Sequence, residues 1–416
     1  MLRPVSRESS RGLSSRINFQ YLDVRIPILM KITRRIFAFS LLLAPFIFSV
    51  AGASAGKPAA NRKYLVFVGT YTNKTESKGI YAYEFDADTG KLTPKGVAAE
   101  TPDPSWVAVH PSGKYLYAAN EAGKASTVSA FAVDTKSGKL TLLNQLPSLG
   151  EDPCYLSFDK TGRYVLVANY SSGTIAVFPI LADGRLGEHT ALLTDQGATG
   201  PNKEHQKGPH AHWIETSPDN RFVLVADLGL DEVLVYKFDA TSGALTPNEP
   251  AFARLKAGSG PRHAAFYPNG KFVFAVSELS STATSFAYDA KKGTLKETGM
   301  ASTLPPGFSG RNDVAEAAVH PNGKFLYVSN RGNDSIAILS IDPGNRTLVP
   351  AGGIPTGGKE PRHFAIDPSG RYLLAENQFS NNIVVFKIDP ATGGLTPTGQ
   401  VVEVPSPVDI AFFPME

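Results

Sequence analysis

Three side chains that could take part in catalysis lie at the two ends of one short stretch, GPRHAAFYPNGKFVFAVSE, which runs from Gly260 to Glu278. Arg262 and His263 lie at its start, and Glu278 ends it. A histidine or a carboxylate can take a proton from water, whereas a guanidinium can hold an anion or stabilise an oxyanion. The stretch is therefore a candidate part of a hydrolytic or proton-transferring site, provided that the fold brings its two ends together.

The middle of this stretch is one copy of an internal repeat. Apolar residues alternate on both sides of a Pro-Asn-Gly turn, which predicts two short antiparallel strands. Five other whole copies occur, and the turn residues of successive copies are 47 to 58 residues apart. The copies begin at Pro104, Pro153, His212, Pro261, Ala315 and Pro361. A period near 50 residues is typical of an array of similar structural units.

Each unit has a second half, such as GIYAYEFDADTGKLTP from Gly79, and this half occurs seven times. The seventh copy of the first half is split between PVDIAFFP at the C-terminus and NRKYLVFVGTY, which begins at Asn61. Four strands in each of seven units predict an all-β fold, a seven-bladed β-propeller of four-stranded blades. We expect N- and C-terminal strands to close the last blade, because this pairing removes an exposed sheet edge.

In such a blade the start of the innermost strand and the end of the next strand lie on the same face, around the central channel. Three positions there differ in chemical kind from blade to blade, whereas the positions between them repeat as small or apolar residues. The first position holds Ser105, Cys154, His212, Arg262, Ala315, Arg362 and Val408. The next holds Trp106, Tyr155, Trp213, His263, Glu316, His363 and Asp409. The third holds Thr70, Glu121, Tyr170, Leu228, Glu278, Arg331 and Gln378. Charged groups gathered at a channel mouth indicate a functional site.

Comparison of equivalent positions in the seven blades also separates the eight histidines by their expected place in the fold. His110 and His320 fall in the turns of the opposite face, where we expect a structural role. Four others approach the channel mouth, where three arginines also converge and favour an anionic ligand. These histidines are His210, His212, His263 and His363.

The segments GPHAHW, GPRH, AEAAVHPNGKFLYVSNRGNDSIA and PRHFAIDPSGRYLLAENQ resemble the seven-bladed-propeller lactonase family, over residues 61–414. That family includes the propeller-type bacterial 6-phosphogluconolactonase and the fungal carboxymuconate cyclase. In the cyclase branch the proposed active site is a His, an Arg, a Glu and an Arg, in that order. The resemblance therefore implies a catalytic set consisting of His212, Arg262, Glu278 and Arg331. His210 competes with His212, because both flank Ala211.

The remaining polar side chains at these positions are expected to bind substrate. They are His210, His263, Glu316, Arg362, His363 and Gln378. In lactone hydrolysis His212 or Glu278 would take a proton from water, and the arginines would hold a carboxylate or phosphate or stabilise the oxyanion.

The resemblance implies a hydrolase that opens an anionic sugar or organic-acid lactone, as 6-phosphogluconolactonase does. A carboxymuconate cycloisomerase would use the same residues differently, with arginines clamping carboxylates. A non-catalytic propeller that binds a ligand or a protein is the third possibility, since a fold does not determine function.

No cofactor or metal site is expected. Cys154 is the single cysteine, so neither an intramolecular disulfide nor a Cys-based zinc site can form. Carboxylates near the channel are few, mainly Glu278, Glu316 and Asp409, which argues against calcium. Glycine-rich nucleotide-binding patterns and a G-x-S-x-G elbow on a strand-to-helix turn are absent from the sequence.

Residues 1–55 have the layout of an export signal. From Met30, the expected start, a basic segment precedes an apolar run and small residues that end at Ala55, where we expect cleavage. The pair Arg34-Arg35 also resembles a twin-arginine signal.

Residues 1–55 carry eight Lys and Arg against two Asp and Glu, so the whole-chain net charge of +3 becomes about −3 after cleavage. Nucleic acid is therefore not an expected partner. Residues 56–416 are expected to form one periplasmic or secreted propeller domain, monomeric and free of the membrane.

Overall fold

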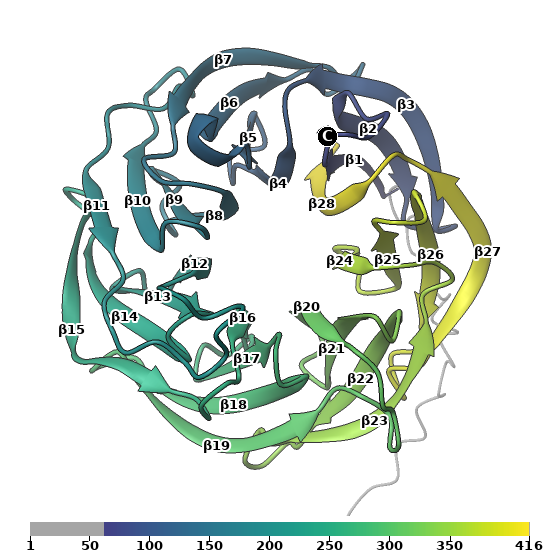
Figure 1. The fold of residues 1–416 in the computed structure, drawn as a ribbon. Coiled ribbons are helices and arrows are strands. Elements are labelled where there is room, and N and C mark those ends of the chain that lie inside the picture. The colour runs from purple at the N-terminus through teal and green to yellow at the C-terminus, as the bar shows by residue number, and fades with distance from the viewer. Residues whose placement is uncertain (1–61, 416) are drawn as a thin grey trace, which may run out of the picture. The chain divides into compact units, whose positions relative to one another are not determined.

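The computed structural model describes residues 62–415, so the expected export segment lies outside the described residues. These residues form seven four-stranded antiparallel sheets, arranged as blades in a ring around a central axis (Figure 1). The predicted all-β seven-bladed propeller is confirmed. No helix within residues 62–415 is long and apolar enough to cross a bilayer.

Each blade has four strands from the channel outward. The innermost strands are β28 (Pro407–Pro414), β4 (Pro104–Val109), β8 (Pro153–Phe158), β12 (Ala211–Thr216), β16 (Pro261–Phe266), β20 (Asp313–Val319) and β24 (Pro361–Ile366). The second strands are β1 (Lys63–Thr70), β5 (Tyr115–Asn120), β9 (Tyr164–Asn169), β13 (Phe222–Asp227), β17 (Phe272–Ser277), β21 (Phe325–Arg331) and β25 (Tyr372–Asn377). The third strands are β2 (Gly79–Asp86), β6 (Thr127–Val133), β10 (Thr174–Pro179), β14 (Glu232–Asp239), β18 (Thr282–Asp289), β22 (Ser335–Ile341) and β26 (Asn382–Ile388). The outer strands are β3 (Lys91–Glu100), β7 (Leu140–Pro147), β11 (Ala191–Thr194), β15 (Ala244–Arg254), β19 (Thr294–Ser302), β23 (Leu348–Pro355) and β27 (Leu395–Glu403). One short 3-10 helix, η1, spans Gly123–Ala125.

The blade that closes the ring combines both ends of the described chain, as predicted. Strand β28 pairs antiparallel with β1, for example Phe67 with Ala411 and Val68 with Ile410. The other three strands of this sheet come from the N-terminal side, in the order β28-β1-β2-β3. We call this sheet the closing blade. Its pairing leaves no unpaired inner edge between the first and the last strands.

Apolar side chains pack between neighbouring blades, and this packing joins the sheets into a ring. One cluster combines Val66 and Val68 of the closing blade with Leu374 and Val385 of the adjacent blade. Another surrounds Phe413 with Phe67 and residues of the second blade. Ring closure therefore depends on the C-terminal strand for packing as well as for backbone hydrogen bonds.

Phe413→Ala is expected to lower the free energy of unfolding by about 3–5 kcal/mol, because it leaves a cavity in the closing blade. The Phe413 side chain is 1% exposed, and its ring lies 6.1 Å from that of Phe67, edge to face. Urea denaturation measures the change. Leu142→Ala is the control, because Leu142 is 54% exposed on β7 and its loss is expected to change little. Equal stability of the Phe413 and Leu142 variants would contradict this view of the closing blade.

The two turn histidines have the structural role expected of them. Nε2 of His110 lies 2.7 Å from the carbonyl oxygen of Gly162, in the corresponding turn of the next blade. Nε2 of His320 lies 2.8 Å from the carbonyl oxygen of Gly370 in the same way. Each imidazole therefore links the turns of two neighbouring blades.

An irregular pairing at the start of each innermost strand sets the direction of the channel-mouth side chains. In β16, Pro261 pairs with Ser277 and His263 pairs with Val276, so Arg262 has no partner of its own. The other innermost strands show register shifts at the corresponding point. A bulge of this kind re-aims a side chain and is common beside functional sites.

The same register corrects one alignment made from the sequence. In the closing blade Pro407 pairs with Thr70, as Pro261 pairs with Ser277, so Thr70 is not the counterpart of Glu278. Tyr71 is. Its N–H donates to the carbonyl of Ser406 at 3.1 Å, as the N–H of Glu278 donates to that of Gly260 at 2.8 Å. The alignment was wrong by one residue because the split copy had to be joined across the chain ends.

Candidate active site

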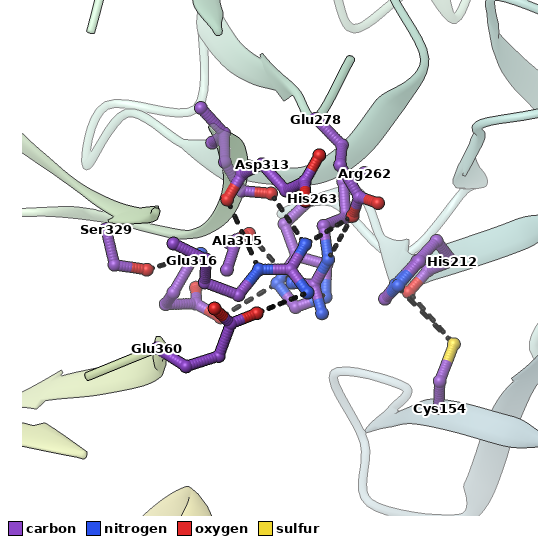
Figure 2. A network of polar contacts seen from close by, with 12 residues as sticks. Cys154, His212, Arg262, His263, Glu278, Asp313, Ala315, Glu316, Ser329 and Glu360 are labelled. Atoms are coloured by element: carbon purple, nitrogen blue, oxygen red, sulfur yellow. Dashed lines mark hydrogen bonds and ion pairs between the residues drawn. The ribbon is translucent and has the colours of Figure 1, made fainter. Parts of the chain in front are cut away.

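The two ends of the stretch from Gly260 to Glu278 lie side by side in one blade, where β16 begins and β17 ends. Nε of Arg262 lies 3.0 Å from Oε2 of Glu278, so the two side chains form an ion pair within one blade (Figure 2). Nη2 of Arg331, at the end of β21 in the next blade, donates to the same oxygen at 2.7 Å. Three of the four predicted catalytic residues are therefore in direct contact.

Backbone carbonyls of β20 hold both guanidiniums in place. Nη1 of Arg262 donates to the carbonyl of Ala315 at 2.8 Å. Nε of Arg331 donates to the carbonyl of Asp313 at 3.2 Å, and its Nη1 lies 3.9 Å from Oε1 of Glu360. Both arginines are buried, so these contacts offset part of the cost of removing their charges from water. The result is a rigid group of positive charges around one carboxylate.

Glu278 is a carboxylate at neutral pH. Burial raises its pKa, but the positive charges of Arg331, Arg262 and Arg362 outweigh burial, and the net pKa lies below the usual 4.5. This ionised group stabilises the two arginines as much as they stabilise it.

Glu278→Gln is expected to lower the free energy of unfolding by about 3–5 kcal/mol at pH 7, because it leaves two buried guanidiniums without their carboxylate. The folded-state pKa of Glu278 is lowered, so its contribution to stability is complete above pH 4.5 and is lost as the pH falls through the folded-state pKa. Urea denaturation at pH 7 and at pH 4 or below should show the difference from wild type shrinking with acidification. A difference that stays constant across this range would contradict the assignment of the charge to Glu278.

His212 lies beside this charged group as a neutral imidazole. Its ring is 5.1 Å from that of His263, and its Nδ1 is 3.5 Å from Sγ of Cys154 (Figure 2). Burial, followed by the charges of Arg262 and Arg362, lowers the pKa of His212 well below 6.5. Burial raises the pKa of Cys154, which keeps it a thiol. An unprotonated imidazole beside an arginine group can accept a proton from water.

His210 occupies a different place from His212. Its Nδ1 lies 2.9 Å from the carbonyl oxygen of Tyr170, and its ring stacks on that of Tyr170 at 4.6 Å. His210 thus packs on the residue that follows β9, whereas His212 faces the rings and charges of the channel. The ring of His212 packs against that of His263, which in turn contacts Arg262, so His212 is nearer than His210 to the arginine group.

Arg362 is the guanidinium in this region that is left free. Within residues 62–415 it makes no ion pair and no side-chain hydrogen bond, and it lies over the ring of Tyr71 at 5.3 Å. The hydroxyl of Tyr71 donates to Oε2 of Glu121 at 2.7 Å. Arg362 lines the same narrow space as Arg262 and Cys154, and its charge contributes to the lowered pKa of both Glu278 and His212. Its donors are available to an anion.

Three residues predicted to bind substrate form a network deeper in the channel. Nδ1 of His263 lies 2.8 Å from Oε2 of Glu316, and Nε2 of His363 lies 3.6 Å from the same oxygen. Nε2 of His363 is also 3.4 Å from Oδ1 of Asp409, whose pKa burial raises to about 7. His363 and Asp409 line a pocket that reaches the turns of the opposite face.

Glu376 belongs to this network and was missed in the sequence. It lies inside β25 and is fully buried, with Oε1 3.1 Å from Nδ1 of His363. Burial raises the pKa of Glu376 well above its usual value. The available signal was a glutamate in LLAENQ, at a strand position where the other copies have a small or apolar residue.

Gln378, the last predicted substrate-binding residue, lines a large pocket at the rim of the channel. This pocket, here called the rim pocket, has a volume of about 1270 Å³. Its wall is formed by the segments after β1, β25 and β27, together with Asp103 and Glu121. Glu121 also lines the narrow space that contains Arg262, His263, Arg362 and Cys154. The rim pocket therefore adjoins the arginine group.

In the part of the chain that the structure describes, no three His, Cys, Asp or Glu side chains are arranged to hold a metal ion.

Comparisons with known proteins agree with this architecture. The family described as lactonase, 7-bladed beta-propeller, matches residues 65–412. The chain is 36% identical over 302 residues to the 6-phosphogluconolactonase of Bacillus subtilis, a match covering 73% of this chain and 84% of that one. Among solved structures, a putative 6-phosphogluconolactonase from Bacteroides fragilis has a TM-score of 0.80 at 36% identity, over 86% of this chain and 99% of that one. A periplasmic gluconolactonase from Pseudomonas aeruginosa has a TM-score of 0.81 at 34% identity, over 85% of this chain and 100% of that one. The chain belongs to the seven-bladed β-propeller lactonase family.

Proposed function

We propose that this lactonase hydrolyses a sugar or organic-acid lactone at the channel mouth, between His212 and the arginine group. The observation that carries the proposal is Arg362, a guanidinium without an ion pair or side-chain hydrogen bond among the described residues, which lines one narrow space together with Arg262, His263 and Cys154. A lactone becomes a carboxylate when it is opened, and the transition state places negative charge on the former carbonyl oxygen. A free, partly buried guanidinium is suited to stabilise that charge.

In the proposed mechanism His212 takes a proton from the attacking water. Oε2 of Glu278 is engaged by two arginines, which lowers its basicity and leaves it better suited to position Arg262 and Arg331. The water oxygen bonds to the acyl carbon, the bond between the acyl carbon and the ring oxygen breaks, and the ring oxygen leaves as a hydroxyl after receiving the proton held by His212. The carboxylic acid so formed ionises and releases one proton to solvent. Arg262 and Arg362 would bind the oxygen on which charge develops.

A panel of lactones tests this function on the purified protein, with proton release as the readout and the spontaneous rate subtracted. It contains glucono-δ-lactone, 6-phosphoglucono-δ-lactone and muconolactone. Hydrolysis of a sugar lactone that Arg262→Ala abolishes would support the proposal. If Arg262→Ala and Glu278→Ala left turnover of every active lactone unchanged, the site would lie elsewhere. Turnover of muconolactone alone would favour the cycloisomerase, and inactivity throughout would favour a binding propeller.

We also propose that the protein is exported and works as a monomer in the periplasm or outside the cell. The basic, apolar and small segments between Met30 and Ala55 support export, as does the similarity to a gluconolactonase described as periplasmic. The mass of the protein recovered from the periplasm tests this, since cleavage near Ala55 is expected. An uncleaved protein confined to the cytoplasm would contradict it.

A further inference from the structure

We propose that the rim pocket is a sugar subsite, and that the natural lactone carries an uncharged glycosyl substituent there, as the δ-lactone of an oxidised disaccharide does. This inference rests on the proposed function and names the substrate class of the same site. The lactone ring would lie at the arginine group, and the second sugar unit would lie in the rim pocket.

The first argument is position. Tyr71, Glu121 and Gln378 each follow the second strand of a blade, in three consecutive blades of the ring, and all three line the rim pocket. Glu278 and Arg331 occupy the same structural position in two other blades. The same structural position therefore supplies Glu278 and Arg331 of the arginine group in two blades and part of the wall of the rim pocket in three others. Glu121 borders both spaces.

The second argument is size. A pocket of about 1270 Å³ exceeds the roughly 300–1,000 Å³ typical of sites for drug-sized ligands. A single aldonolactone ring held at the arginines would leave the rim pocket unused. A second sugar unit extends the substrate into this space without altering the lactone.

The third argument is the chemistry of the wall. The Phe379 side chain is 69% exposed at the pocket, a flat apolar surface of the kind that packs against a sugar ring. Glu76 and Glu403 form no ion pair or hydrogen bond through their carboxylates within the described residues, and the side-chain amide of Gln378 likewise has no partner there. Carboxylate oxygens accept hydrogen bonds from hydroxyls, and an amide both donates and accepts.

The fourth argument is charge. The pocket contains four carboxylates, against the single cation Lys74. These are Glu76, Asp103, Glu121 and Glu403. Such a wall repels a phosphate or a second carboxylate and tolerates a neutral polyol. The anionic group of the product therefore belongs at Arg362, and the part of the substrate in the rim pocket is uncharged. Hydrolysis then breaks the acyl C–O bond of the lactone and leaves the glycosidic bond intact.

The test compares kcat/KM for cellobiono-δ-lactone, glucono-δ-lactone and 6-phosphoglucono-δ-lactone, measured by proton release on the purified protein. We expect the disaccharide lactone to be preferred over glucono-δ-lactone by at least about tenfold, and Phe379→Ala to reduce this ratio by about tenfold. Phe252→Ala is the matched control, because Phe252 is an exposed phenylalanine on β15 outside the rim pocket. The control should keep the wild-type ratio.

Three outcomes would overturn the inference. A disaccharide lactone that reacts no faster than glucono-δ-lactone would mean that no sugar unit is bound. A preference for the phosphorylated lactone over both would place a charged group at the rim. A disaccharide preference that Phe379→Ala leaves intact, or that Phe252→Ala reduces equally, would place the sugar elsewhere. If glucono-δ-lactone is hydrolysed in any of these cases, the proposed lactonase site stands, whereas inactivity on every lactone removes both proposals.

Discussion

His212→Gln is expected to lower kcat by about 10²–10⁴-fold, the usual contribution of a positioned general base. Glutamine approximates the size and hydrogen bonding of the imidazole but cannot accept the proton from water. His212 is buried, and burial together with the charges of Arg262 and Arg362 lowers its pKa well below 6.5. The imidazole is therefore unprotonated at neutral pH without needing a carboxylate partner.

The expected pH dependence of kcat follows from the lowered pKa of His212. A base is active when deprotonated, so activity is lost as the pH falls through its pKa. Because the pKa of His212 is lowered, kcat should remain level through pH 6.5 and decline only at more acidic pH. Initial rates between pH 4.5 and 8 measure this profile.

Two other histidines control for a general effect of the substitution. His189 is exposed in the third blade, and His189→Gln should retain full activity. His210→Gln should lose less than His212→Gln, because His210 packs on Tyr170. A His212→Gln variant with near wild-type kcat, together with an inactive Glu278→Gln variant that remains folded, would reassign the base to Glu278.

Arg362→Ala is expected to lower kcat/KM by about 10²–10³-fold, the usual effect of removing one group that stabilises an oxyanion. Arg362 has no internal ion pair or side-chain hydrogen bond among the described residues, so its charge is available to the substrate. For the same reason, its loss should change the free energy of unfolding far less than loss of Glu278 does. This contrast separates a role in substrate binding from a role in the fold.

Steady-state kinetics and urea denaturation of the same variants check both expectations. Arg362→Lys keeps the charge but lacks the planar pair of donors, so only partial recovery is expected. Lys359→Ala, an exposed cation in the same blade, is the control. An Arg362→Ala variant with unchanged kcat/KM would show that the free guanidinium does not contact the reacting lactone.

The blade pattern could be predicted because it rests on local signals. Alternating apolar residues and Gly-containing turns recur at a nearly constant period, and each copy confirms the others. The comparison failed where that redundancy was lost, at the split copy, and Thr70 was aligned in place of Tyr71. A β-bulge such as the one at Arg262 has no sequence signal of comparable strength, so the direction of individual side chains was not predictable.

The sequence by itself determined the seven four-stranded blades, the closure by both chain ends and the positions where charged residues gather. Only the tertiary structure decided how those residues pair. Arg262 and Arg331, from different blades, share Glu278, whereas Arg362 remains free and the adjacent His363 turns toward Glu376 and Asp409. The physical reason is that neighbouring residues on a strand point in different directions, and that contacts between blades, such as that of Arg331 with Glu278 at a separation of 53 residues, form only when the ring closes.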